Sequence, residues 1–203
     1  MQEVIERGVA DAIRRGRFDE AASVGLRGYG PEILGFLVAI GPSTAEDAFS
    51  QFCEDMWRAL PAFRAQASFR TWAYTLARHA ASRIKRDPYS RRRASLSGLG
   101  TISAIAEELR SSTASYLATR VRDRMAQIRD ELAEDDRELL VLRVDRQMAY
   151  QDIARVTLGD DAAEVEVAKR SAALRKRFER LKQEIRERAE REGLVEKKAT
   201  RGK

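Results

Sequence analysis

Apolar residues recur at spacings of three and four along almost the whole chain, which is the period of an amphipathic helix. The first two segments with this pattern span residues 2–15 and 18–28, separated by Arg15-Gly16-Arg17. We expect a stop at Gly28 to Gly30, after which Pro31 opens a helix that ends at Gly41-Pro42. No segment shows the convincing alternation of a strand, so the pattern predicts an all-α fold.

Two further helices are predicted on either side of a short polar interruption, Pro61 to Ala67. Ser43 and Glu46 have the spacing of a capping box, which would begin a helix that runs to about Leu60. Ser68 is placed to cap the next helix, which ends near Asp87-Pro88. The apolar face of that helix carries Phe69, Trp72, Ala73, Leu76, Ala80 and Ile84.

The stretch from Tyr89 to Gly100 is rich in arginine, serine and glycine and predicts a flexible, basic linker. Extended residues here, followed by a helix over 102–117, are long enough to place two domains more than one turn of DNA apart. Beyond them, helices are predicted over 121–132, 136–144, 150–158 and 163–192, followed by a disordered basic tail. The chain is therefore expected to hold two small helical domains, divided as 1–28, 29–88, 89–119, 120–192 and 193–203.

Composition narrows the classes of function. A net charge of +6 and a pI near 9.7 favour an anionic partner such as nucleic acid, although only modestly. The single cysteine and single histidine exclude an internal disulfide and the usual zinc clusters, so no metal or other cofactor is expected. No apolar run is long enough to span a bilayer and the start lacks a signal peptide, which predicts a cytoplasmic protein without membrane insertion. Without a glycine-rich phosphate loop or a nucleophile motif, we expect no catalytic residues and no enzyme.

The strongest local pattern for DNA binding lies near the C-terminus. The segments 136–144 and 150–158, a turn at Gly159 and a long basic helix follow one another in the order of a helix-turn-helix. The exposed face of the last helix would present Arg175, Lys176, Arg177, Arg180 and Lys182 to phosphates and guanine edges. The alternative is that these are solvated cations paired with glutamates at helical spacing.

A second candidate lies in the first domain, where aromatic, basic and small polar residues alternate from Phe63 to Tyr74. Such a surface can stack unpaired bases while its cations follow the backbone. Phe69 and Trp72 share the apolar stripe and are expected in the core, which leaves the loop residues as contacts. The candidates there and along the following helix are Phe63, Arg64, Gln66, Ser68, Arg70, Arg78, His79 and Arg83. The preceding acidic helix suits a protein partner or is merely solvated.

Together these clusters resemble the extracytoplasmic-function (ECF) branch of bacterial sigma factors, which keep only the second and fourth conserved regions. The resemblance covers about residues 29–88 and 120–188. For the second region it rests on Tyr29-Gly30-Pro31, Phe36-Leu37, Ala45-Glu46-Asp47, Trp57-Arg58-Ala59-Leu60-Pro61, Phe63-Arg64, Ala67-Ser68-Phe69-Arg70-Thr71-Trp72 and Ala77-Arg78. For the fourth it rests on Leu139 to Arg143, Tyr150, Ile153-Ala154, Leu158-Gly159 and the basic final helix.

The resemblance implies a role for each cluster. Core RNA polymerase would be bound, at the clamp coiled coil of its largest subunit, by Asp47, Gln51, Glu54, Asp55 and Arg58. The loop from Phe63 to Ser68 would capture a base flipped from the minus-ten element, with Arg70, Arg78, His79 and Arg83 holding the melted strand or its flanking duplex. The basic final helix would read the duplex minus-thirty-five element. Family members are commonly held inactive by an anti-sigma factor, which makes such a protein a candidate partner, and they join the nucleoid when bound to polymerase.

Three positions depart from the family pattern: Ser50-Gln51 stands in place of a Gln-Glu pair, Ala149 in place of a hydroxyl cap, and Asp160 to Val167 adds an acidic stretch before the basic helix. Two other classes of protein remain open. A helix-turn-helix regulator would bind duplex DNA without polymerase. A helical protein-interaction adaptor would need no basic recognition helix, and changing Arg175 or Lys176 would leave its activity intact.

Overall fold

The computed structural model describes residues 1–86, 102, 104–109 and 131–191, and in these ranges the chain is helical without a strand. The all-α prediction is confirmed. The helices are α1 (Gln2–Arg14), α2 (Phe18–Ile40), α3 (Ala45–Ala59), α4 (Phe69–Arg86), α7 (Glu134–Leu140), α8 (Tyr150–Leu158) and α9 (Glu164–Arg191). Short turns of helix join some of them: η1 (Pro42–Thr44), η2 (Leu60–Ala62) and the π-helical turn η4 (Val141–Asp145).

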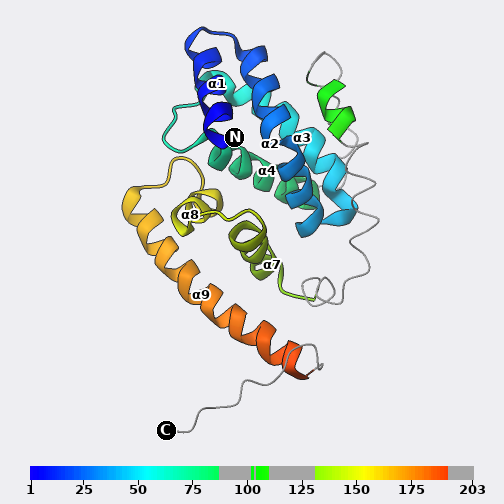
Figure 1. Ribbon diagram of the computed structural model, residues 1–203, viewed down its shortest axis with the longest axis vertical. Helices are drawn as coiled ribbons and strands as arrows, with labels where there is room; N and C mark the ends of the chain where they lie inside the picture. Colours follow the sequence, from blue (N-terminus) through cyan, green and yellow to red (C-terminus); the bar gives the residue numbers. More distant parts are fainter. Residues whose placement is uncertain (87–101, 103, 110–130, 192–203) are drawn as a thin grey trace.

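Helices α1 to α4 form one bundle, which occupies the upper half of Figure 1. Its centre is aromatic: Phe36 of α2 meets Tyr74 of α4 edge to face, with ring centroids 5.2 Å apart. Phe49 and Phe52 of α3 are also fully buried. Burial of a large side chain of this kind stabilises a fold by roughly 1.5–3 kcal/mol, so the interlocking aromatic rings fix how α4 sits on α2 and α3.

The expected stop at Gly28 to Gly30 is wrong, because α2 continues through these residues and carries Pro31 in its interior. The glycines serve close packing between helices. A Cβ on Gly28 would lie 2.7 Å from side-chain atoms of Ile5 in α1, and one on Gly25 would lie 2.4 Å from the ring of Phe69 in α4. A side chain at either position would overlap its neighbour, so glycine lets α1 and α4 approach α2.

Helix starts agree with the sequence in one case and differ in another. Ser68 caps α4 as predicted, since its hydroxyl oxygen accepts a hydrogen bond of 3.0 Å from the backbone N–H of Thr71. The capping box of Ser43 and Glu46 is wrong, because Pro42–Thr44 forms a 3-10 turn and α3 begins without a side-chain cap. The hydroxyl of Thr44 instead donates to the carbonyl oxygen of Gly41 at 3.3 Å.

The last three helices pack around a second small core. Tyr150 of α8 meets Phe178 of α9 with ring centroids 6.1 Å apart, and the apolar face of α9 is buried as its periodicity predicts. The helix expected over 136–144 begins two residues earlier and widens into the π-helical turn after Leu140. The expected helix over 121–132 lies almost wholly outside the described residues, as do the basic linker at 89–100 and the C-terminal tail.

The segment between the two groups of helices is partly described. Residue 102 and residues 104–109 are helical, and Ile102, Ile105 and Ala106 are buried. Leu109 lies against Gly30 of α2, where an added Cβ would approach its Cδ1 to 2.4 Å. This part of the expected spacer therefore packs on the first bundle, and the two groups of helices touch each other instead of standing apart. None of the described helices has the length and apolarity of a membrane span.

Candidate nucleic-acid interface

The five residues predicted to contact a protein partner all lie on α3: Asp47, Gln51, Glu54, Asp55 and Arg58. Gln51 is 8% exposed and donates a 2.9 Å hydrogen bond to Asp55. Asp55 also forms an ion pair of 2.6 Å with Arg83 of α4, and Glu54 pairs with Arg58. Glu54 and Asp55 are thus each held by a neighbouring arginine, and the buried Gln51 supports Asp55 instead of facing the surface itself.

The loop from Phe63 to Ser68 is anchored at both ends. The ring of Phe63 is half-buried and lies 4.8 Å from the centroid of Trp72, so this end joins the aromatic core. At the other end, Ser68 caps α4. Between them, Arg64, Ala65 and Gln66 are exposed. Trp72 itself is 5% exposed, which confirms that it is a core residue.

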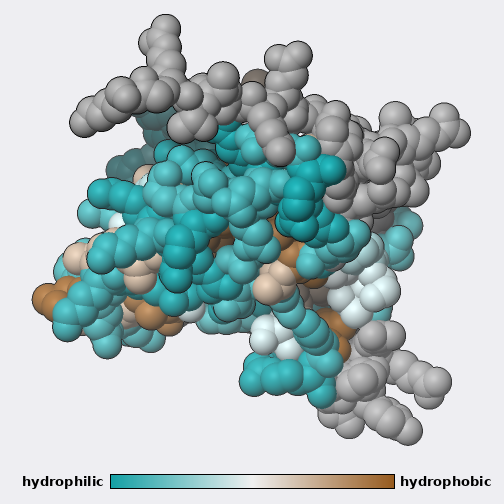
Figure 2. All heavy atoms as spheres, turned by 90° about the horizontal axis from the view of Figure 1, so that it is seen from below, coloured by the Kyte–Doolittle hydropathy of each residue, from teal (hydrophilic) through white to brown (hydrophobic). Residues whose placement is uncertain are grey.

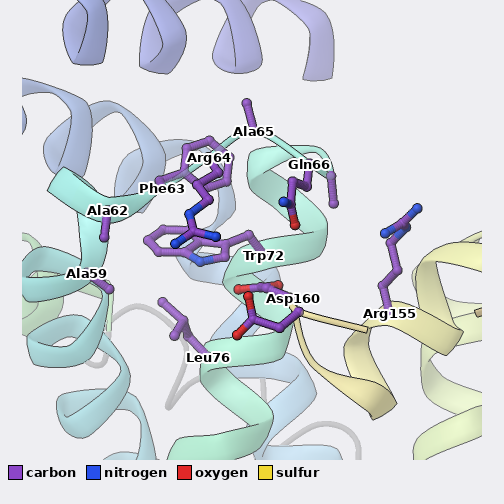
Figure 3. A pocket seen from close by; sticks show the side chains of 12 residues that line it. Ala59, Ala62, Phe63, Arg64, Ala65, Gln66, Trp72, Leu76, Arg155 and Asp160 are labelled. Atoms are coloured by element: carbon purple, nitrogen blue, oxygen red, sulfur yellow. The ribbon is translucent and has the colours of Figure 1, made fainter. Parts of the chain in front are cut away.

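The exposed loop borders a cavity of about 290 Å³. Figure 3 shows Arg64, Gln66, Trp72 and Leu76 on one side of this cavity, with Arg155 and Asp160 facing them from α8 and the loop that follows it. The wall therefore combines the half-buried ring of Phe63, a cation and an amide, the set of groups that stacks and hydrogen-bonds a nucleobase. The carboxylates of Asp160 and Asp161, which also line the cavity, disfavour nucleic acid.

The cations of α4 follow the loop along the helix, and most are paired. Arg70 makes a two-pronged ion pair with Glu32 of α2, through N–H···O distances of 2.7 and 3.0 Å, and its side chain is 12% exposed. Arg78 pairs with Glu138 of α7 at 2.7 Å. His79 lies at the surface, where partial loss of water around the side chain and the nearby arginines lower its pKa, so the neutral form dominates at pH 7.

The five cations predicted for duplex DNA all lie on α9: Arg175, Lys176, Arg177, Arg180 and Lys182. Arg177 is held by Asp136 of α7 at 2.5 Å, and the guanidinium of Arg175 lies 5.5 Å from the ring centroid of Tyr150. Lys182 pairs with Glu179 one turn earlier. Lys176 and Arg180 are exposed, and neither has an ion-pair partner in the described part of the chain. Figure 2 views the molecule from below, and its coloured surface is mostly hydrophilic.

The acidic stretch from Asp160 to Val167 has two parts, a loop and the first turn of α9. Gly159 adopts φ +99°, Asp160 to Ala163 form a loop, and α9 begins at Glu164. Ala149, the residue before α8, makes no side-chain hydrogen bond to the start of that helix, because its side chain is a methyl group. The first turn of α9 is therefore acidic, which favours the helix through its dipole but disfavours phosphate, and the cations of the helix begin in its second turn, at Lys169.

Residues 26–92 match the family model of sigma-70 region 2. This match supports a sigma-70 family sigma factor. It spans most of α2, all of α3 and α4 and the loop between them, and it runs past the last described residue of α4. No curated protein and no solved structure matches the chain. The segment that carries the candidate loop and the acidic helix is thus the segment that matches the family model.

Several residues that position the segment matching sigma-70 region 2 could not be found from a sequence pattern. The carboxylate of Glu6 in α1 accepts hydrogen bonds from the backbone N–H groups of Phe69 and Arg70, at 2.8 and 3.0 Å, and from the hydroxyl of Tyr29. Glu6 therefore caps α4 and orients the end of the candidate loop, although it lies more than sixty residues away in sequence. In the sequence, Glu6 is only an acidic residue on the polar side of an amphipathic helix, and nothing there indicates its partners. Glu32 and Glu138 were missed for the same reason.

One prediction arises from the backbone of the loop from Phe63 to Ser68. Ala65 adopts φ +54°, a left-handed conformation that costs a residue with a Cβ about 1–2 kcal/mol. We expect Ala65→Gly to raise the free energy of unfolding by about 0.5–1 kcal/mol, because relief of this strain outweighs the greater freedom of glycine in the unfolded chain. Urea denaturation measures the change. Ala67→Gly is the matched control. Ala67 does not have a positive φ, so this substitution relieves no strain and should destabilise the protein.

Proposed function

We propose that this protein is an alternative sigma factor of the ECF type and not an enzyme. It would bind core RNA polymerase through α3 and direct it to promoters, where α4 and the preceding loop open the minus-ten element and α9 reads the minus-thirty-five element. It would act in the cytoplasm, on the nucleoid when bound to polymerase, and an anti-sigma factor is a candidate regulator. The observation that carries the proposal is the match of residues 26–92 to sigma-70 region 2.

The geometry of the loop supports a role in melting. A base that leaves the duplex loses its stacking, and an aromatic wall with a cation and an amide at its rim restores that interaction at roughly 1–3 kcal/mol per base. Because only the unpaired strand receives this energy, binding favours the open promoter over the closed one. Arg64 and Gln66 are the exposed polar groups at the rim. The mechanism needs only binding energy and no covalent step.

The order of α8, the turn at Gly159 and α9 supports a helix-turn-helix at the second element. Within the described part of the chain, two of the five cations of α9, Lys176 and Arg180, have no ion-pair partner and are available to phosphate, and the other three are engaged. We propose that the engaged cations orient the helix, and that the free ones supply most of the affinity for duplex DNA. A regulator that binds duplex DNA without polymerase would use the same helix.

Purified protein, core RNA polymerase and a genomic DNA library together test the proposed function. We expect the protein to co-purify with core enzyme and to produce discrete new start sites in transcription in vitro. Arg64→Ala should reduce opening of the promoter, measured by permanganate reactivity of unpaired thymines, more than formation of the closed complex. A protein that ignores core polymerase but binds duplex DNA alone would instead be a classical regulator. A protein that binds neither would be an adaptor.

A further inference from the structure

The N-terminal helix α1 reaches the end of the candidate loop, at the point where α4 begins. It lies along α2, and Figure 1 shows its N-terminal end beside the start of α4. Its packing is close, because Val9 is fully buried and Ile5 fills the space beside Gly28 of α2. Helix α1 precedes residues 26–92, so the match to sigma-70 region 2 assigns it no role.

Glu6 of α1 completes the cap of α4. An α-helix begins with backbone N–H groups that have no acceptor within the helix, and a capping side chain usually accepts from one of them. Ser68 accepts from the N–H of Thr71 at 3.0 Å. The two carboxylate oxygens of Glu6 accept from the N–H groups of Phe69 and Arg70, at 2.8 and 3.0 Å. A residue of α1 therefore binds two N–H groups that the local cap leaves without an acceptor.

The carboxylate of Glu6 is itself held in place. The hydroxyl of Tyr29 in α2 donates a 2.7 Å hydrogen bond to it, and Tyr29 is buried. Burial, and after it the hydrogen bond to Glu6, raises the pKa of Tyr29, so the phenol keeps its proton and remains a donor. The negative charge also lies at the positive end of the α4 dipole, where it is favoured. Donors from α2 and α4 therefore converge on one carboxylate of α1.

Phe69 transmits the position of Glu6 to both ends of the loop. Its ring is buried between Tyr29 and Phe63, with centroid distances of 6.1 and 5.9 Å, and Phe63 is the residue at which the loop begins. Ser68, at the other end, directly precedes Phe69 in the chain. Between these ends Ala65 adopts φ +54°, a conformation that persists only when the surroundings impose it. The shape of the loop therefore depends on how firmly its two ends are held.

We propose that Glu6 is a positioning residue for promoter opening, and that α1 thereby belongs to the same apparatus as the loop. Glu6 touches no DNA in this role. By fixing the start of α4 it keeps Arg64 and Gln66 in the arrangement that receives an unpaired base, so the loop need not be ordered when the base arrives. If that arrangement is populated only part of the time, apparent affinity for the base falls in proportion. The inference rests on the proposed function of the loop in opening promoters.

Two substitutions of Glu6 test this role in the full chain with core polymerase. Glu6→Ala removes both acceptor oxygens. Glu6→Gln keeps the size of the side chain but replaces one acceptor with a donor, so one of the converging donors loses its partner. We expect promoter opening, followed by permanganate reactivity of unpaired thymines, to slow about tenfold with Glu6→Ala and about threefold with Glu6→Gln. Binding to core polymerase and formation of the closed complex should stay within about twofold of the parent protein.

Two control variants in the same helix separate positioning from stability. Glu3→Ala removes an exposed carboxylate that pairs with Arg7 at the surface, and it should change neither stability nor opening. Val9→Ala removes buried methyl groups and should lower the urea midpoint, but it leaves the hydrogen bonds of Glu6 in place. At a temperature where circular dichroism shows every variant to be folded, opening should slow with Glu6→Ala and keep the parent rate with Val9→Ala.

The outcomes separate the role of Glu6 from the proposed function. If Glu6→Ala opens promoters at the parent rate, or slows no more than Val9→Ala, Glu6 only stabilises the bundle and the inference is overturned while the proposed function stands. Equal losses of core binding and of opening would overturn it as well, because α1 would then support the whole domain. If Glu6→Ala does not fold, the same comparison is made with Glu6→Gln. A parent protein that neither binds core polymerase nor opens promoters would remove the proposed function itself.

Discussion

Arg70→Ala should lower the free energy of unfolding by about 3 kcal/mol, a loss typical of removing one partner of a largely buried ion pair. Both prongs of its guanidinium bind Glu32, and one also donates to the carbonyl oxygen of Arg146. The side chain of Glu32 is 23% exposed and would be left without its cation. Resemblance to the sigma factor family implies DNA binding for Arg70, whereas its contacts here predict mainly a structural effect.

The measurement is urea denaturation of the purified variant, followed by the strand-opening assay under conditions where the variant is folded. Glu32→Gln and the double variant complete a cycle, and a coupling energy of at least about 1 kcal/mol is expected for neighbours in direct contact. Arg64→Ala is the matched control on the same surface. Its side chain is exposed, so its stability should change by less than about 0.5 kcal/mol while opening falls.

The two variants thus distinguish structural from contact arginines within one short segment. If Arg70→Ala kept the stability of the parent protein and lost strand opening, the ion pair with Glu32 would be dispensable and Arg70 would be a strand contact, as the resemblance implies. If Arg64→Ala lost stability instead, the exposed loop would have a structural role that its position does not suggest.

Local patterns predicted those features that depend on neighbours in sequence. Periodicity alone locates α1, α4, α8 and α9, because each carries one apolar face over several turns. The cap formed by Ser68 is also local, since its partner is three residues away. By contrast, the glycines of α2 led us to expect an end to the helix, although they serve the packing of neighbouring helices. Their role emerges only when Ile5 and Phe69, which are distant in sequence, are seen to occupy the space beside them.

The candidate site divides in the same way. Its exposed loop was predictable, because Arg64 and Gln66 sit in a short polar interruption between helices. The partners of these groups could not be predicted, because they come from elsewhere in the chain. Glu6 binds the start of α4, Glu138 binds Arg78, and the backbone of Arg146 binds Arg70. A count of charges along one helix cannot distinguish a cation that is already neutralised from one that awaits phosphate.

The clearest case of this distinction is α9, where we expect the double variant Lys176→Ala with Arg180→Ala to weaken duplex binding strongly. Both cations are exposed and lack ion-pair partners in the described ranges, so each is available to displace counterions from DNA. Loss of two phosphate contacts should reduce the slope of log affinity against log salt concentration by about 2, with affinity falling for all sequences alike. Fluorescence anisotropy of a labelled duplex over a potassium chloride series measures both quantities.

Arg177→Ala is the matched control on the same helix. Arg177 is bound by Asp135 and Asp136 of α7, and these hydrogen bonds, the one to Asp136 first, raise its pKa, so its charge already serves the packing of α7 on α9. Its loss should leave the salt slope within about half a unit of the parent value and lower the free energy of unfolding by about 1 kcal/mol. A salt slope that falls with Arg177→Ala but not with the double variant would reverse the assignment, placing the paired cation on the DNA and the free ones away from it. Because stability and salt dependence are measured independently, a variant that merely unfolds cannot imitate one that has lost a phosphate contact.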